Sequence, residues 1–255
     1  MRYVFAGDRE ISVKVLAFLM KQGLNPLALM VTNPKSQSHA NELKDLSQLP
    51  ESNIWEGKDF TSDHSYEILN SINPDYIIGI HFPYIIPENI LRLPKIGFLN
   101  LHPGYLPYNK GWHTPSWSIL ENTKIGGTLH FMAKKLDSGD IILQLETEKK
   151  INDTANTLYQ RVLNTEFEVF KQALPYLTSL NPPRTKQIND DGTSHVKKEL
   201  FDPRFQELQL DESIKVKDLI QKLRAHTTSN ILESAFFIEN SKKYRIQIHI
   251  SECDE

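Results

Sequence analysis

Residues 75–102 read DYIIGIHFPYIIPENILRLPKIGFLNLH, and this stretch decides the fold. It holds two short apolar segments, 75–81 and 97–101, on either side of a loop rich in proline. Short apolar runs without alternation are typical of strands that are buried on both faces. Such strands occur in parallel sheets covered by helices, so the stretch predicts an α/β protein.

The sequence on both sides alternates strand-like and helix-like segments, as a parallel sheet requires. Strands are expected over residues 2–6, 26–32 and 126–132, and helices over residues 11–22, 63–71 and 153–177. Asp153 or Thr154 is expected to cap the last of these helices. The polar residues 35–52 fit either a mobile excursion or a short helix. We predict a Rossmann-like, open, mostly parallel sheet.

A change of pattern follows residue 180. Asn181-Pro182-Pro183-Arg184 ends the last helix of the core, and residues 189–192 are typical of a turn. Residues 216–226 predict an amphipathic helix, and residues 236–238 and 244–250 predict a hairpin around Asn240-Ser241. We therefore expect a core over residues 1–180 and a small extension, a helix plus a β-hairpin, over residues 181–255.

Composition limits the classes of partner. The formal net charge of -3 and the pI of about 6.3 disfavour nucleic acid and anionic membranes as electrostatic partners. The single cysteine, Cys253, excludes an intramolecular disulfide. The first residues enter a strand pattern without a signal-peptide core, and no apolar run approaches the roughly 18 residues of a membrane span. We expect a cytoplasmic protein.

Three polar residues stand out as candidates for chemistry. Asn100 and His102 are two residues apart, so on a strand their side chains share one face. Asp137 begins the turn-rich sequence Asp-Ser-Gly-Asp, which can carry a carboxylate back to the same edge of the sheet. The amide can stabilise an oxyanion, and a carboxylate beside an imidazole orients it for proton transfer. Each residue alone also fits a structural role, and spacing leaves both interpretations open.

A family resemblance adds to this pattern. Residues 100–111, NLHPGYLPYNKG, followed by LDSGD at 136–140, resemble the signature of the formyltransferases that use N10-formyltetrahydrofolate. The resemblance extends over roughly residues 1–180. It implies the formyltransferase fold, that cofactor, and a catalytic set of Asn100, His102 and Asp137, with Asp140 structural. It implies no metal.

The resemblance also implies how the reaction proceeds. An amine of the acceptor attacks the formyl carbon, Asn100 and His102 stabilise the oxyanion, and His102 or a water held by Asp137 takes the proton. The pterin is expected to lie against the loop after residues 75–81, where backbone groups recognise the edge of its ring. The expected cofactor-binding residues are Phe82, Tyr84, Ile85, Ile86 and Asp137.

The acceptor is suggested by a more specific likeness. Residues 104–117, GYLPYNKGWHTPSW, and residues 219–237 resemble the dTDP-amino-sugar N-formyltransferases, which serve surface polysaccharide such as O-antigen. We expect dTDP-4-amino-4,6-dideoxyglucose as acceptor, with the 3-amino isomer, a glycinamide ribonucleotide-type acceptor, or a folate-binding protein without catalysis as alternatives. A methionyl-tRNA acceptor is disfavoured by the net charge and by the short region after the core. Glycinamide ribonucleotide transformylases usually end near the end of the core, so a resemblance to them does not account for the region after it.

Acceptor contacts are expected from aromatic platforms and from cations that can bind a diphosphate. The expected residues are Arg9, Tyr105, Lys110, Trp112, Trp117, Lys186, Arg224 and Phe236. The enzymes of this resemblance are commonly dimers, and an isolated hairpin is only marginally stable. We therefore expect a homodimer that involves the C-terminal helix and hairpin.

Overall fold

The computed structural model of the chain describes residues 1–33, 35, 38–188 and 192–253. These residues form two compact units, each assembled from separate stretches of the chain. The first unit comprises Met1–His102, Thr128–Gln144 and Glu166–Gln187, and the second comprises Pro103–Gly127, Leu145–Thr165 and the residues from Ile188 onward. The boundary that we expect at residue 180 separates a catalytic core from an extension, which is a division by function. The two structural units do not test it, so it stays a prediction.

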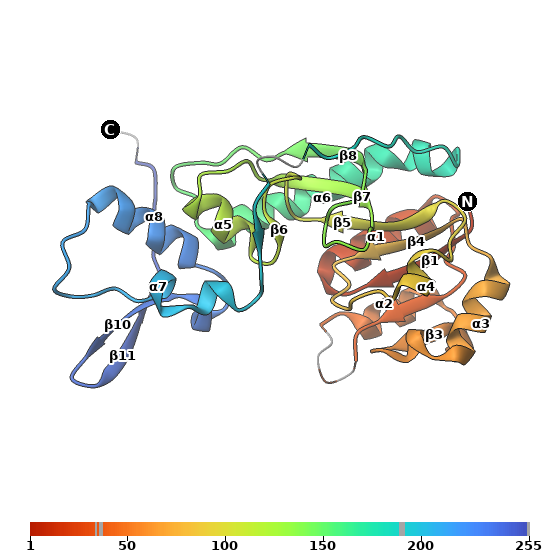
Figure 1. The fold of residues 1–255 in the computed structure, drawn as a ribbon, viewed down its shortest axis with the longest axis horizontal. Coiled ribbons are helices and arrows are strands. Elements are labelled where there is room, and N and C mark those ends of the chain that lie inside the picture. Colours follow the sequence, from red (N-terminus) through yellow and green to blue (C-terminus); the bar gives the residue numbers. More distant parts are fainter. Residues whose placement is uncertain (34, 36–37, 189–191, 254–255) are drawn as a thin grey trace. The chain divides into compact units, whose positions relative to one another are not determined.

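The first unit is built on a sheet whose described strands have the order β3-β2-β1-β4-β5-β7-β8 (Figure 1). The neighbours from β3 to β5 are parallel, and β7 is antiparallel to β5. The chain order reverses at β1, which has β2 on one side and β4 on the other, and ligands of such sheets bind beyond the strands' carboxyl ends at this point. The strands are β1 Tyr3–Gly7, β2 Leu29–Val31, β3 Ile54–Glu56, β4 Tyr76–Ile80, β5 Gly97–His102, β7 Gly126–Phe131 and β8 Ile141–Glu146.

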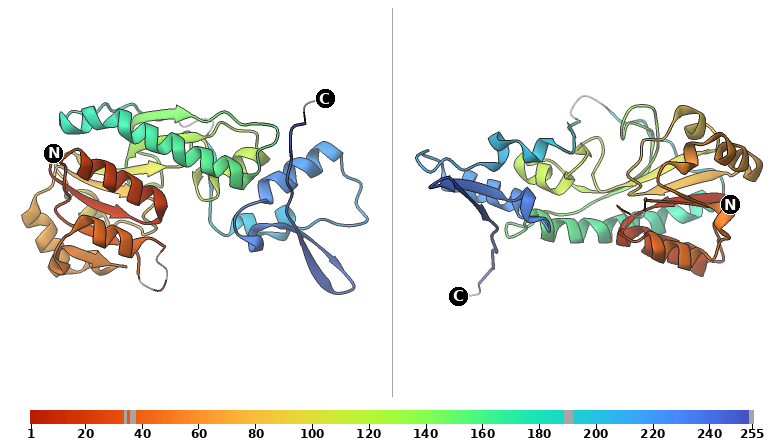
Figure 2. Two further views of the ribbon diagram at one scale, coloured as in Figure 1. Left: turned by 180° about the vertical axis from the view of Figure 1, so that it is seen from behind. Right: turned by 90° about the horizontal axis from the view of Figure 1, so that it is seen from below.

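Helices cover both faces of this sheet. On one face, Val4, Ile77 and Phe98 form a buried cluster with Leu69 of α3 and Ile90 of α4. The opposite face carries α1 and α6, which lie side by side in Figure 2 and meet where Phe18 packs edge-on against Phe167 at 5.8 Å between ring centroids. Burial on both faces explains why these strands lack alternation. The helices are α1 Arg9–Lys21, α2 Ala40–Ser47, α3 Asp63–Ile72, α4 Glu88–Leu91 and α6 Ala155–Thr178, whose first residues belong to the second unit.

The second unit is mainly helical. Its elements are β6 Lys110–Gly111, α5 Thr114–Leu120, β9 Ser194–His195, α7 Pro203–Gln206, α8 Val216–His226, β10 Ala235–Glu239 and β11 Lys242–Ile246. The strand β6 pairs in parallel with β9, and β10 pairs with β11 as an antiparallel hairpin. A buried patch of Ile119, Ile125, Leu158, Val162 and Ala225 joins α5, α6 and α8.

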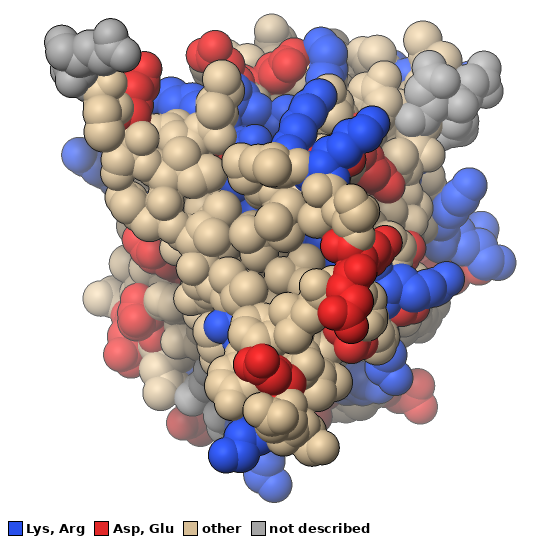
Figure 3. Space-filling model, turned by 90° about the vertical axis from the view of Figure 1, so that its left-hand side faces the viewer, with Lys and Arg blue, Asp and Glu red and all other residues tan. Residues whose placement is uncertain are grey.

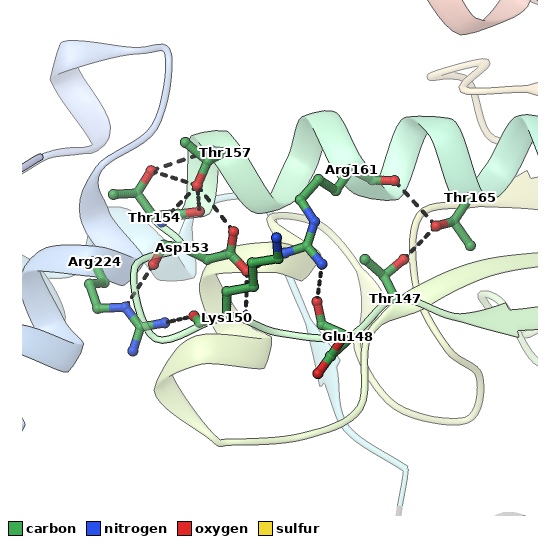
Figure 4. A network of polar contacts seen from close by, with 9 residues as sticks. All are labelled: Thr147, Glu148, Lys150, Asp153, Thr154, Thr157, Arg161, Thr165 and Arg224. Atoms are coloured by element: carbon green, nitrogen blue, oxygen red, sulfur yellow. Dashed lines mark hydrogen bonds and ion pairs between the residues drawn. The ribbon is translucent and has the colours of Figure 1, made fainter. Parts of the chain in front are cut away.

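A polar network fixes the start of α6 within the second unit (Figure 4). Asp153 Oδ2 accepts hydrogen bonds from the Lys150 amide and from Arg161 Nη1, both at 2.6 Å. The guanidinium of Arg224 on α8 donates to the carbonyls of Asp153 and Lys150 at 2.7 and 2.8 Å. Thr154 caps the helix, because its hydroxyl accepts from the Thr157 amide at 3.3 Å. The network joins α8 to the start of α6.

Most of the predicted elements are confirmed. The helix over residues 216–226 has the predicted bounds, and Asn240 and Ser241 both have positive φ angles, of 49° and 61°, at the hairpin turn. The expectation for residues 26–32 was too long, since β2 covers only Leu29–Val31. The helix expected from Asp153 begins two residues later, because Thr154 is its cap. Of the two alternatives for residues 35–52, the structure shows a short helix, α2.

Two expectations lie partly outside the described residues, namely the turn over 189–192 and the segment 35–52. In the part of the chain that is described, no helix is long and apolar enough to cross a membrane.

Candidate active site

The strand β5 brings two of the predicted catalytic residues to the carboxyl end of the first unit's sheet. Asn100 and His102 lie on the same face of β5, and their partners on the antiparallel strand β7 are His130 and Thr128. On the other side, Asn100 pairs with Gly79 of β4. A Cβ on Gly79 would lie 3.0 Å from the Leu99 carbonyl oxygen, a tight contact that the glycine avoids beside this part of β5.

Asp137 reaches the same place from the loop between β7 and β8. Its backbone has a positive φ of 45°, and Gly139 lies so close to the Phe131 carbonyl that any side chain there would collide with it. Gln187 holds the loop from outside, since its Nε2 donates to the carbonyls of Asp137 and Gly139 at 2.9 and 2.8 Å. Two features therefore fix the loop: the position of Gly139, where no side chain fits, and the two hydrogen bonds from Gln187.

The three predicted residues converge. Asp137 Oδ2 lies 3.6 Å from His102 Nδ1, and Asp137 Oδ1 lies 3.4 Å from Asn100 Nδ2. The side chains of His102 and Asp137 are only 4% and 8% exposed. These separations are at the long limit of hydrogen bonding, so the amide is oriented without being tightly engaged. Its N–H groups can turn to an oxygen on which negative charge develops.

A fourth residue, His130, belongs to this cluster and was not foreseen. Its Nδ1 donates to the Phe131 carbonyl at 2.9 Å, which leaves Nε2 of the neutral ring as an acceptor. That Nε2 lies 3.3 Å from Asn100 Nδ2 and 3.6 Å from Asp137 Oδ1, and the His130 side chain is 1% exposed. His130 therefore orients the Asn100 amide. The only signal in the sequence was a histidine within a strand, and the pairing register of β7 was needed to interpret it.

The predicted cofactor loop follows β4. Phe82, Tyr84 and Ile86 pack against the core cluster, with the rings of Phe82 and Tyr84 5.1 Å apart, whereas Ile85 is 94% exposed. Among the described residues, the carbonyls of residues 82–86 and the backbone amides of Phe82, Tyr84, Ile85 and Ile86 find no hydrogen-bond partner. Since buried or half-buried backbone groups are nearly always paired, this unused edge can accept the polar edge of a ligand.

The predicted acceptor contacts fall into two groups. Arg9 and Lys186 of the first unit are exposed, and Tyr105 and Trp112 of the second unit are half-buried. The other four are better explained as internal packing, because each is held by contacts within the second unit. Lys110 is 7% exposed, Trp117 stacks on His195 at 3.8 Å, Arg224 binds two carbonyls, and Phe236 is 3% exposed beneath Lys243.

Comparison with known proteins agrees with this geometry. Residues 1–174 match the family model described as formyl transferase. Residues 203–252 match the model of the N-formyltransferase dimerization C-terminal domain. Together the two models cover the sheet with its polar cluster and the region from α7 to the end of the hairpin.

Individual relatives have different acceptors. The methionyl-tRNA formyltransferase of Clostridioides difficile is 28% identical over 75% of this chain, which spans 64% of the relative's length. A 4-N formyltransferase from Francisella tularensis has a similar structure, with a TM-score of 0.82 at 22% identity over 99% of this chain and 98% of that one. The formyltransferase PseJ from Anoxybacillus kamchatkensis, in complex with UDP-4,6-dideoxy-4-formamido-L-AltNAc and tetrahydrofolate, is 29% identical over 77% of this chain and 97% of its own, with a TM-score of 0.55.

Proposed function

The chain belongs to the formyl transferase family, and we propose that it transfers a formyl group to the amine of a dTDP-linked dideoxyamino sugar. The proposed donor is N10-formyltetrahydrofolate, and the proposed acceptor is dTDP-4-amino-4,6-dideoxyglucose. The observation that carries the proposal is the convergence of Asn100, His102 and Asp137 at the carboxyl end of the sheet. The product would serve surface polysaccharide, such as O-antigen.

The cluster fits the chemistry of acyl transfer to an amine. Asn100 donates an N–H to the oxygen on which charge develops, and His130 holds the amide in that direction. Asp137 lies beside both His102 and Asn100, so a proton released by the amine passes either to His102 or to a water on Asp137. Burial of the cluster strengthens these interactions, because water does not screen them.

The loop after β4 fits the proposed donor. Its unused backbone amides and carbonyls over residues 82–86 match the edge of a pterin, which carries both donors and acceptors. Phe82, Tyr84 and Ile86 support this backbone from the core side, and Ile85 offers an exposed apolar surface. When bound, the donor supplies an activated formyl group. PseJ, the relative at 29% identity, was solved with tetrahydrofolate, which supports the same class of ligand here.

A 4-amino sugar is favoured as the acceptor by two relatives. The Francisella tularensis enzyme is a 4-N formyltransferase, and the ligand of PseJ carries a 4-formamido group. Within the first unit Arg9 and Lys186 are exposed, and within the second unit Tyr105 and Trp112 are half-buried, so each residue is a separate candidate for a contact with a nucleotide sugar. The 3-amino isomer remains the alternative within the same chemistry.

Methionyl-tRNA is a weaker candidate despite the curated relatives. A tRNA acceptor needs a basic groove for its phosphates. The formal net charge of this chain is -3. On the face drawn in Figure 3, basic (blue) and acidic (red) side chains of the described residues are interspersed, and neither forms a continuous surface. This distribution supports a small acceptor.

We also propose that the chain is a homodimer that uses its C-terminal region. The dimerization-domain match over residues 203–252 supports this. Large apolar side chains are exposed on α8 and the hairpin, including Ile220, Ile238 and Tyr244 at 42%, 48% and 43%. A dimer interface would cover these side chains, and burial of apolar surface is favourable. Sedimentation at micromolar concentration tests the proposal, and a monomer would contradict it.

A panel assay tests the function. The purified protein is incubated with N10-formyltetrahydrofolate and, separately, with dTDP-4-amino and dTDP-3-amino dideoxyhexoses and glycinamide ribonucleotide. Mass spectrometry then detects the addition of one formyl group. Formylation of the 4-amino sugar is expected. A product only from glycinamide ribonucleotide would reverse the choice of acceptor, and binding of the folate without any product would indicate a non-catalytic binder.

A further inference from the structure

A hydrogen-bonded pair of a histidine and a carboxyl group, from distant parts of the sequence, lies at the end of β4. His81 directly follows this strand, and its Nε2 lies 2.9 and 3.1 Å from the two carboxylate oxygens of Glu166 on α6. Both residues belong to the first unit. The His81 side chain is 9% exposed and the Glu166 side chain is fully buried. The pair is separate from Asn100, His102 and Asp137, and the proposed reaction does not use it.

Burial makes this pair unusual. A buried carboxylate is strongly unfavourable unless a charge partner and hydrogen bonds compensate it. Replacing buried ion pairs by apolar residues of similar size is often neutral or stabilising. Stability alone therefore gives little reason for a buried pair of this kind. Conformational specificity, which holds one backbone arrangement against others, is the better explanation.

The backbone at His81 is itself strained. Its φ of 50° lies in the left-handed region, which a residue with a side chain seldom adopts. Such conformations persist where the surroundings enforce them, and they gather at ligand clamps. The bond from Nε2 to Glu166 fixes the imidazole from one side, and the pairing of β4 with β1 and β5 fixes the preceding backbone from the other. The direction in which the chain leaves β4 is set at this residue.

That direction determines where the next residues lie. The loop 82–86 contains no helix or strand, and among the described residues its backbone is not hydrogen bonded. It is held by side chains, chiefly the rings of Phe82 and Tyr84 against Phe60 at 5.5 and 6.2 Å. The packing of these rings fixes how deeply the loop is buried better than it fixes the rotation of the loop's peptide groups. The anchor at His81 therefore controls how the free amides and carbonyls point.

We propose that His81 is a positioning residue for the folate donor, and that its hydrogen bond with Glu166 holds the backbone of residues 82–86 in the form that binds the pterin. The proposal rests on the proposed function, since it presumes that this loop binds a folate. His81 does not touch the reacting atoms. It acts on affinity for the donor and leaves acceptor binding unchanged.

Two variants test the pair, each of which changes one of its two residues. Glu166→Gln keeps the shape and removes the charge. His81→Asn keeps a residue that tolerates the left-handed conformation but is too short to reach Glu166. The matched control is Asp75→Asn, which removes the charge from a carboxylate that accepts from the Arg2 amide (2.7 Å) just before the other end of the same strand. If either pair variant populates the binding form only a tenth of the time, its affinity for the donor falls about tenfold.

Calorimetric titration with 5-formyltetrahydrofolate, a stable analogue, measures this directly. Its stoichiometry counts the folded molecules, so a loss of affinity is separated from a loss of fold. We expect each pair variant to bind the analogue about tenfold more weakly than wild type, and Asp75→Asn to bind it as wild type does. The double variant should lose no more affinity than the single variant that loses more, because the two residues act as a unit. In turnover, KM for the donor should rise while KM for the amino sugar stays unchanged.

The outcomes separate the two proposals. Wild-type affinity in Glu166→Gln and His81→Asn, or additive losses in the double variant, would overturn the role of the pair while leaving the function intact. If Asp75→Asn weakened binding of the analogue equally, His81 and Glu166 would only stabilise the fold in general. That result would also overturn the proposed role of the pair. Absence of binding to the wild-type protein would overturn the proposed donor, and with it this inference.

Discussion

The loop that carries Asp137 can be displaced by one methyl group. A Cβ added at Gly139 would overlap the carbonyl oxygen of Phe131 and lie 2.8 Å from its carbon, where real contacts essentially never fall under 3.0 Å. The obstacle is backbone of a buried strand, so no side-chain rotation relieves it. Gly139→Ala must therefore move the loop, and Asp137 with it, away from β7.

The size of the effect follows from the geometry. Relieving the overlap requires a shift of about 1 Å, and a shift of that size in a catalytic group can lower turnover by about 100-fold. The carboxylate now lies 3.6 Å from His102 Nδ1, so the same shift removes it from ion-pair distance. The move also strains the two bonds from Gln187 and the bond from the Phe131 amide to the Asp140 carbonyl. Losing two or three such bonds lowers the free energy of unfolding by about 2–3 kcal/mol.

The assay is single-turnover formylation of the amino sugar, with the melting temperature measured on the same protein. Turnover of Gly139→Ala should fall about 100-fold, and the melting temperature should fall by about 5–10 °C. The control is Ser138→Ala, which removes only a bond to the Lys135 carbonyl within the exposed loop. It should behave as wild type. If folded Gly139→Ala turned over within about twofold of wild type, the position of Asp137 would not matter to the reaction, and the reasoning would fail.

Three further changes have distinct signatures. Asn100→Ala removes the proposed oxyanion donor and should lower turnover per folded molecule by about 10²–10³; near-normal turnover would refute that role. Asp153→Asn removes the carboxylate bound to Arg161 in the second unit and should lower the free energy of unfolding by about 2–3 kcal/mol, in chemical denaturation, without affecting turnover per folded molecule. Burial lowers the pKa of His226, whose ordinary value is 6.5. Because the unfolded chain then binds the proton more readily, stability is complete above about pH 6.5 and is lost as the pH falls toward the lower folded pKa, by up to about 1.4 kcal/mol per pH unit. Urea unfolding of His226→Gln should lack this component, and an unchanged pH dependence would contradict it.

Local sequence pattern predicted the parts of the site that lie within one element. Asn100 and His102 are two residues apart on a strand, so their common face followed from strand geometry. The turn sequence after Leu136 indicated that Asp137 returns to the sheet edge, and the structure places its carboxylate beside both residues. The helix over residues 216–226 was equally readable, because its apolar spacing and length are properties of one segment.

Contacts between distant segments could not be predicted in this way. His130 faces Asn100 only because β7 pairs with β5 in one particular antiparallel register. Gln187 clamps a loop 50 residues earlier in the chain, and Glu166 pairs with His81 over 85 residues. Neither residue type nor local periodicity specifies such partners. Trp117 is a further example, because its stacking on His195 joins segments that lie far apart in the sequence.

The central claim is that the cluster of Asn100, His102 and Asp137 formylates a nucleotide-linked amino sugar. A competition experiment tests it most directly. A limiting amount of N10-formyltetrahydrofolate is given to the enzyme with equal amounts of dTDP-4-amino-4,6-dideoxyglucose, its 3-amino isomer, glycinamide ribonucleotide and methionyl-tRNA, and the site of formylation is identified by mass spectrometry. The account predicts that the formyl group is found on the 4-amino sugar with the wild-type enzyme and on no acceptor with folded His102→Ala. Formyl transfer to the ribonucleotide or the tRNA in preference to both sugars, or undiminished transfer by His102→Ala, would contradict it.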